Sequence, residues 1–146
     1  MRTFILCLIA TLTLIQDVSL TWASEEYSLF NGAGKAEAYI SMDDDFTIYL
    51  WTGEPVAYID SKGDDLHVYG FNGKHLGWLI NGAIWGHDGN AYCAGKQSIN
   101  FTEFEPFKSF KQFKPFKSFQ EFAPFKPFLT NSFSNTPCGI LLRTGI

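Results

Sequence analysis

Three histidines, His67, His75 and His87, are the side chains best suited to acid–base or metal chemistry in this sequence. None of them has the short spacing to another histidine or to a cysteine that zinc ligands usually show. Two acidic stretches, 43–45 and 60–65, could offer oxygen ligands to calcium, but neither follows the alternating pattern of an EF-hand loop. We therefore predict exposed histidines beside turns, acids that solvate links between elements, and no metal or cofactor.

Compact catalytic motifs are missing from the sequence. It contains no Gly-x-Ser-x-Gly elbow, no phosphate-binding loop and no pair of carboxylates at an interpretable spacing. The net charge of −4 makes nucleic acid an unfavourable partner. We predict that the protein is not an enzyme. An exported hydrolase is the weakest alternative, because it needs a polar cleft that the sequence does not indicate.

Two cysteines, Cys93 and Cys138, remain once the N-terminal apolar segment with Cys7 is set aside. An oxidising compartment would allow them to form a disulfide, which would tie the C-terminal region to the preceding domain. Cys93 also fits a position where only small side chains recur. Both interpretations stay open at this stage.

These residues are positioned by a repeat of twelve residues, which covers 29–40, 48–59, 68–79 and 84–95. Its sixth residue is always glycine, its second is always aromatic, and its tenth is always small. A short internal repeat of this kind indicates one structural unit used several times. The four glycines are Gly34, Gly53, Gly73 and Gly89.

Each repeat is typical of a β-hairpin. Asn-Gly at 72–73 and Asp-Gly at 88–89 favour a two-residue type I′ turn between apolar runs. In the second repeat such a turn pairs Ile48 with Ala57 and Tyr49 with Val56. Alternation then separates a small face from an aromatic face. We predict an all-β fold of four hairpins about a common axis, with the small face inward and the aromatic residues between neighbouring hairpins.

Phenylalanine occupies every third position from 101 to 128, and a nine-residue repeat lies over this period. We call these ten side chains the Phe ridge. Proline recurs at 106, 115 and 124, which disfavours an α-helix, whereas polyproline II has three residues per turn and would align all ten rings. Acids predominate in 24–100 and bases in 101–146, so the extended Phe/Pro/Lys-rich tail at 101–130 is expected to lie against its own head or another acidic surface.

The two ends of the chain differ in character. Residues 1–23 combine Arg2, a short apolar core and a small-residue cleavage site, which predicts a secretory signal peptide, with an uncleaved anchor as the alternative. The mature protein is then secreted or periplasmic and has no membrane span. Residues 131–146 fit either a last short strand at 140–142 or a disordered end.

The segments Tyr49-Leu-Trp, Pro55-Val-Ala-Tyr-Ile, Tyr69 to Trp78 and His87-Asp-Gly-Asn90 resemble the bacterial 4-fold beta flower family over about residues 28–95. The resemblance implies a small all-β module with four hairpins about a pseudo-fourfold axis. It transfers no catalytic residue. The tail looks like a variant of the apolar, proline-containing tails of that family.

Two functions compete. The first is a secreted, non-enzymatic structural or interaction module whose Phe-rich tail docks on its own head or on a partner protein. The second is a module that binds carbohydrate at a cell surface through exposed hairpin aromatics, with Trp51, Tyr58, Trp78 and Trp85 as candidates. For the first function the candidate partner contacts are the central five residues of the Phe ridge: Phe107, Phe110, Phe113, Phe116 and Phe119.

Overall fold

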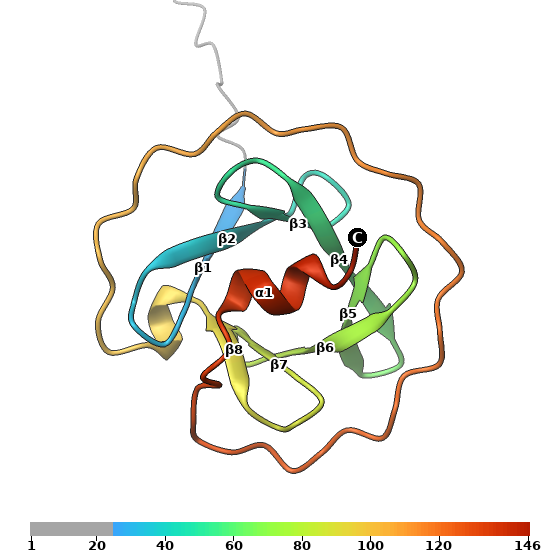
Figure 1. Ribbon diagram of the computed structural model, residues 1–146. Helices are drawn as coiled ribbons and strands as arrows, with labels where there is room; N and C mark the ends of the chain where they lie inside the picture. Colours follow the sequence, from blue (N-terminus) through green and yellow to red (C-terminus); the bar gives the residue numbers. More distant parts are fainter. Residues whose placement is uncertain (1–24) are drawn as a thin grey trace, which may run out of the picture.

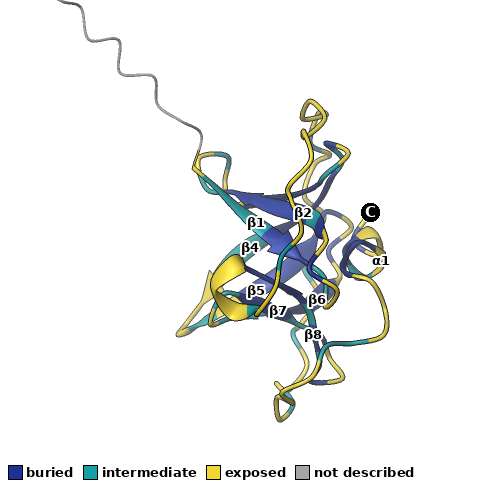
Figure 2. Ribbon diagram, turned by 90° about the vertical axis from the view of Figure 1, so that its left-hand side faces the viewer, coloured by how far each residue is buried: buried dark blue, intermediate teal, exposed yellow. Residues whose placement is uncertain are grey.

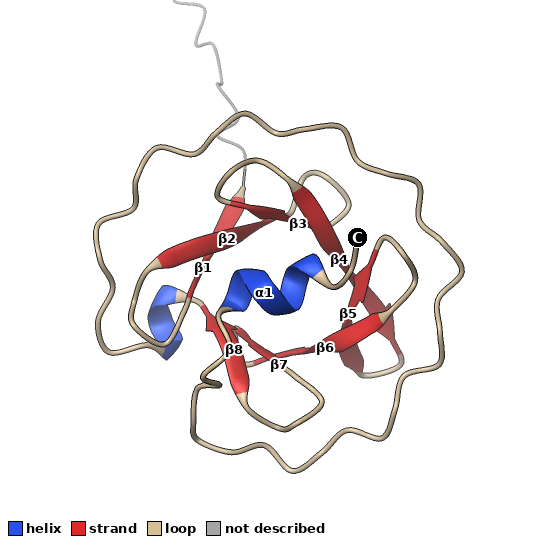
Figure 3. Cartoon of the chain, in the orientation of Figure 1, coloured by secondary structure: helices blue, strands red, loops and turns tan. Residues whose placement is uncertain are grey.

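A closed barrel of eight antiparallel strands, each paired with its neighbours in chain order, forms the body of the protein (Figures 1 and 3). The computed structural model describes residues 25–146. This architecture confirms the all-β fold of four hairpins. The strands are β1 (Glu26–Phe30), β2 (Ala36–Ser41), β3 (Thr47–Leu50), β4 (Pro55–Lys62), β5 (Asp65–Gly70), β6 (His75–Ile80), β7 (Ala83–Trp85) and β8 (Ala91–Ala94).

All four repeat glycines lie at hairpin reversals and have positive φ, from 78° to 88°. In the second hairpin Leu50 accepts a hydrogen bond from the N–H of Gly53 and donates one to the carbonyl of Glu54. The other three hairpins repeat both bonds. Since no other residue of these turns has positive φ, each loop is a three-residue turn that ends in a glycine bulge. The predicted type I′ turn is wrong, because it needs positive φ at two positions.

The bulge shifts the pairing by one residue near each turn. Ile48 pairs with Ala57 as predicted, but Tyr49 pairs with Pro55 and not with Val56. Val56 is thereby placed in the buried apolar cluster instead of on the aromatic face, and Leu76 of the next hairpin follows it. Many other residues of the small face line the barrel interior as expected and are fully buried: Leu29, Ala38, Ile48, Ala57, Val68, Ile84 and Cys93.

The aromatic side chains pair between neighbouring hairpins on the outer face of the barrel. Tyr39 stacks on Tyr49 across β2 and β3, with ring centroids 5.6 Å apart, and Tyr58 stacks on Tyr69 across β4 and β5 at 6.4 Å. All four rings are buried. Something outside the barrel must therefore cover them.

Residues 101–130 supply much of that cover. After a short 3₁₀ helix, η1 (Lys96–Ser98), the chain contains no helix or strand through residue 130 and runs as an extended ring around the barrel (Figure 1). It returns beside β8, where Phe133 forms a bridge with Ala91. Figure 2 shows this ring as an exposed band outside the buried strands.

The C-terminal residues form a helix, α1 (Cys138–Arg143), at the end of the barrel that carries the hairpin turns. Cys138, Gly139 and Leu142 are buried there. The strand expected for residues 140–142 and the disordered end are both wrong, since residues 138–143 form a helix. Its helical spacing brings Cys138 and Leu142 to the same buried side.

The predicted signal peptide at 1–23 lies outside the described residues. Within 25–146, none of the helices has the length and apolar character needed to cross a bilayer.

Candidate interaction surface

Backbone hydrogen bonds attach the tail to each hairpin in turn. The nine-residue period of the tail places one amide N–H at every hairpin, and each donates to the turn glycine at 2.8 or 2.9 Å. Since backbone groups make these bonds, the tail composition alone did not reveal them. The donors Glu103, Gln112, Glu121 and Thr130 bind the carbonyl oxygens of Gly34, Gly53, Gly73 and Gly89, respectively.

The same glycines also make room for the tail. A Cβ atom on Gly53 would overlap the carbonyl oxygen of Phe110, and one on Gly73 would overlap that of Phe119. In the same way, a Cβ atom on Gly34 would overlap the carbonyl oxygen of Phe101, and one on Gly89 would overlap that of Phe128. Glycine is thus required twice at each position, by its positive φ and by the close approach of the tail.

A second series of bonds follows the same period. Ser109 donates its N–H to Trp51, and Ser118 donates its N–H to Phe71. The next equivalent residue is Pro127, which has no N–H to donate. The tail is therefore held most fully over the second and third hairpins.

Lysines of the tail cover the buried tyrosines and pair with acids of the barrel domain. Lys108 lies 4.6 Å above the Tyr39 ring and 2.6 Å from Glu26. Lys117 lies 4.1 Å above the Tyr58 ring. Each ammonium gains a cation–π contact, and the lysine stem shields the aromatic pair from water. Further ion pairs join Lys111 to Glu26, Lys114 to Asp44 and Asp45, and Lys126 to Asp65.

The sequence did not identify these lysines individually as docking residues. Two signals were present: the opposite charge of the two regions, and a tail period that recurs once for each hairpin. The structure brings the tail against its own head.

The Phe ridge faces away from the barrel along its whole length. Phe101 is 66% exposed, and the other nine side chains are 94–102% exposed. Every third side chain of the tail is a phenylalanine that faces solvent, while side chains between them, such as Lys108, Lys117 and Gln120, reach the barrel. The tail is thus docked on its own head and at the same time presents its apolar side chains to solvent. The five central candidates, Phe107 to Phe119 at every third position, all lie on this exposed side.

The four aromatics considered for sugar stacking lie elsewhere. Tyr58 and Trp78 are buried, at 3% and 1% exposure, so the expectation that they contact a sugar is corrected. Trp51 and Trp85 are half-buried, and their indole N–H groups donate to the carbonyls of Pro106 and Ile80. The shared outer face that these rings occupy is already covered by neighbouring aromatics and by the tail.

The three histidines form a hydrogen-bonded chain in which His67 and His75 are buried, so their expected exposure is wrong, whereas His87 is exposed as expected. Nδ1 of His67 lies 2.9 Å from Nε2 of His75, whose Nδ1 lies 2.8 Å from Nε2 of His87. The turn bulge produces this arrangement, because it places His75 opposite Tyr69 on the outer face. Burial, with repulsion from His87 and then His67, lowers the pKa of His75 from 6.5 to about 4. His75 directs different nitrogens to its two neighbours, so the three rings do not converge on one metal position, and no metal-binding cluster of His, Cys, Asp and Glu occurs within residues 25–146.

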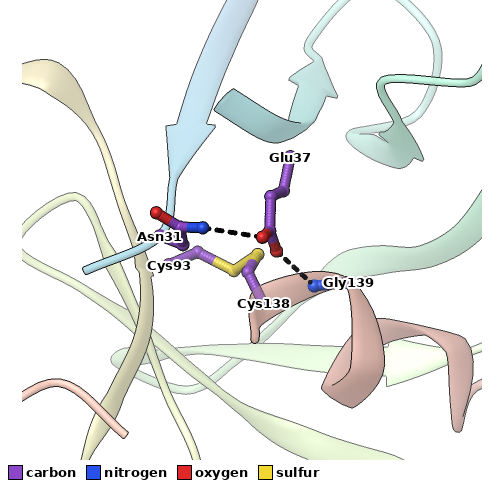
Figure 4. The surroundings of a disulfide bond; sticks show 5 residues. All are labelled: Asn31, Glu37, Cys93, Cys138 and Gly139. Atoms are coloured by element: carbon purple, nitrogen blue, oxygen red, sulfur yellow. Dashed lines mark hydrogen bonds between the residues drawn. A yellow bond between two sulfur atoms is a disulfide. The ribbon is translucent and has the colours of Figure 1, made fainter. Parts of the chain in front are cut away.

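Cys93 of β8 and Cys138 of α1 form a disulfide inside the barrel end (Figure 4). Glu37 lies beside it and accepts hydrogen bonds from Asn31 at 2.7 Å and from the N–H of Gly139 at 2.9 Å. The disulfide and these bonds fix α1 to the first and last hairpins. The tail is therefore anchored at both ends, by β8 before it and by α1 after it.

A separate apolar cavity of about 420 Å³ opens at the other end of the barrel, among the links between hairpins. Ile40, Ile59 and Leu79 form its floor, and the half-exposed side chains of Phe46 and Leu66 stand at its rim. It lies on a different part of the molecule from the encircling tail.

No curated protein and no solved structure matches the chain. A family model does match: the one described as "4-fold beta flower protein" covers residues 27–142, which includes the barrel, the tail and most of α1. With four equivalent hairpins and a match over more than half of its length, the chain belongs to the 4-fold beta flower family.

Proposed function

We propose that this protein is an exported, non-enzymatic interaction module whose barrel serves as a rigid mount for the Phe ridge. The observation that carries the proposal is the contrast between the tail backbone and the tail side chains. The backbone is bonded to all four hairpins, whereas nine of ten phenylalanines are at least 94% exposed. Exposed apolar surface of this extent is typical of sites that bind a partner.

Pre-ordering of the tail strengthens this interpretation. A free peptide with ten phenylalanines would lose backbone entropy on binding, about 1–2 kcal/mol for each residue that becomes fixed. Here the barrel has already fixed the backbone through bonds at Gly34, Gly53, Gly73 and Gly89. More of the energy gained by burying the rings is then available for the affinity of the complex.

Export is supported by two observations. Residues 1–23 have the composition of a secretory signal. The bond between Cys93 and Cys138 is of a kind that persists in oxidising compartments and is rare in the cytosol. The sugar-binding alternative has lost its support, because its four candidate rings are buried or half-buried.

The test is a variant in which Phe107, Phe110, Phe113, Phe116 and Phe119 are all replaced by serine. A matched control replaces the same five residues by leucine and keeps the surface apolar. We expect the serine variant, which keeps Phe104, Phe122, Phe125 and Phe128 exposed, to be retained much more weakly on a phenyl matrix than the leucine variant and the parent. The melting temperature should change by less than about 4 °C, because fully exposed rings contribute little to stability. A larger fall in the serine variant would show that the rings belong to the core, and would overturn the proposal.

A further inference from the structure

We infer that the Phe ridge binds the Phe ridge of a second copy, so that the rings of the two tails interdigitate. This inference rests on the proposed function and names the partner. Each exposed phenylalanine is a separate knob, because lysines between the rings, such as Lys108 and Lys117, reach over rings of the barrel. A row of evenly spaced knobs is complementary to another row shifted by half a period.

The spacing favours this arrangement. Three residues of polyproline II advance by about 9 Å, which is the expected distance between neighbouring knobs along the tail. A ring inserted midway from a second copy would lie about 4.7 Å from each neighbour. This value falls within the range of about 4.5–7 Å that aromatic pairs prefer between centroids.

Charge does not oppose the contact. The lysines next to the ridge are turned toward the barrel, where Lys108 and Lys111 pair with Glu26, and Lys114 pairs with Asp44. Two approaching tails therefore bring together phenylalanines whose neighbouring lysines reach toward acids and rings of the barrel. Pro106, Pro115 and Pro124 limit the freedom of the tail backbone, so little order has to be gained on association.

The shape of the ridge limits how strong each contact can be. The tail encircles the barrel and is convex toward solvent, so two copies can meet only along a short arc (Figure 1). If three rings of each copy interdigitate at about 200 Å² per ring, each partner buries about 600 Å². This is less than the roughly 800 Å² per partner of a standard stable interface. Other arcs of the same ring stay open to further copies, so we expect weak, open-ended association instead of a closed dimer.

Self-association is tested by sedimentation of the mature protein over a range of concentrations up to about 0.5 mM, as an interface of this size requires. The weight-average mass of the parent should rise continuously and pass that of a dimer, whereas the five-serine variant, which keeps one arc of three exposed rings at 122, 125 and 128, should not pass the mass of a dimer. A parent that is retained on a phenyl matrix but remains monomeric would overturn this inference and leave the proposed function standing. Loss of both properties would overturn both. Flotation of the parent with phosphatidylcholine vesicles, without any rise in mass, would also overturn the inference and would identify a lipid partner.

The site of contact is tested by placing a photoreactive benzoylphenylalanine at position 113 and mapping the cross-linked peptides. Cross-links between tails, within residues 101–130 of two copies, are the expected result. Cross-links to the residues around the cavity at the other barrel end, such as Phe46 and Leu66, would overturn the ridge-to-ridge contact, as would a cross-link yield equal to that of the five-serine background.

Discussion

Tyr69 of the barrel and Phe119 of the tail lie in neighbouring parts of the molecule but differ completely in solvent exposure. The hydroxyl of Tyr69 donates a hydrogen bond to the carbonyl of Glu121, two residues after Phe119. Tyr69 is fully buried, whereas Phe119 is 102% exposed. Both the barrel and the tail repeat aromatic residues, at a variable spacing in the hairpins and at every third residue in the tail. The barrel buries its rings, whereas the tail exposes them.

The difference comes from what each backbone needs from its side chains. A strand has two faces, and closure of the barrel leaves one inside while the tail covers the other. The tail has three sides, and it contacts the barrel through its amides, carbonyls and lysines. Its phenylalanines are therefore not required for docking. A segment whose apolar side chains are its least buried part is the part of the molecule for which we propose a partner.

The largest expected effect comes from removing the disulfide that holds the C-terminal end of the tail to the barrel. In the double variant Cys93→Ala with Cys138→Ala, we expect the free energy of unfolding to fall by about 4 kcal/mol, because a cross-link over 45 residues restricts the unfolded chain by that amount. Urea unfolding measures the loss. Reduction of the parent protein should produce a loss of similar size without changing any other side chain.

The tail should respond more than the barrel to this release. Limited proteolysis of the double variant is expected to cleave within 101–137 before it cleaves the strands. A loss of less than about 1 kcal/mol would mean that the disulfide adds little to the contacts between tail and barrel, far below the usual value for such a bond.

A smaller and more local change separates the two roles of the turn glycines. In Gly73→Ala the new methyl group meets both a φ of +88° and the carbonyl oxygen of Phe119. Gly63→Ala is the matched control, because its φ is +63° and nothing lies within 4 Å of the added Cβ. We expect the control to cost about 1 kcal/mol through backbone strain, and Gly73→Ala to cost about 3 kcal/mol because it also displaces the tail. Equal losses in thermal or urea unfolding would contradict the tail contact.

The repeat, the reversals and the all-β class could be predicted from the sequence, because glycine with positive φ and apolar alternation act locally. The turn type could not, since Asn72-Gly73 suits both a type I′ turn and a three-residue turn with a glycine bulge. This single choice moved Val56 and Leu76 into the core and His75 onto the outer face. A pairing error of one residue changes the side of every residue up to the bulge.

The points at which the tail attaches to the barrel could not be predicted, for a different reason. Charge opposition indicated that the tail would meet its head or another acidic surface, but the attachment depends on backbone N–H groups that every residue except proline has. Only the nine-residue period, matched to the hairpins, marks Glu103, Gln112, Glu121 and Thr130 as the donors. The exposure of the Phe ridge then follows from which side of the tail those amides occupy.

The smallest expected effect concerns the point where the buried histidines meet the tail. The backbone N–H of His75 donates to the side chain of Glu121 at 2.8 Å, and the ring is flanked by His67 and His87, with Lys62 adding to the repulsion. The pKa of His75 is about 4 in the folded protein, against 6.5 for an unperturbed histidine, so the unfolded chain binds more protons between these values. The contribution of His75 to the free energy of unfolding should therefore be complete above pH 6.5, and it should be lost as the pH falls toward 4.

Substitution of His75 by glutamine isolates this contribution. The variant keeps the backbone bond to Glu121 and removes the titrating ring, so its stability should depend less on pH between 6.5 and 4 than that of the parent. Lowered pKa values of Asp44 and Asp88 affect both proteins alike, and they act as the pH falls through still lower values. If urea unfolding at a series of pH values gives parallel curves for parent and variant, His75 has no part in the acid sensitivity. If the stability of the parent depends more steeply on pH than that of the variant, as expected, the contact between His75 and the tail weakens in acid. The exposed phenylalanines do not titrate, so their apolar surface is the same at each pH.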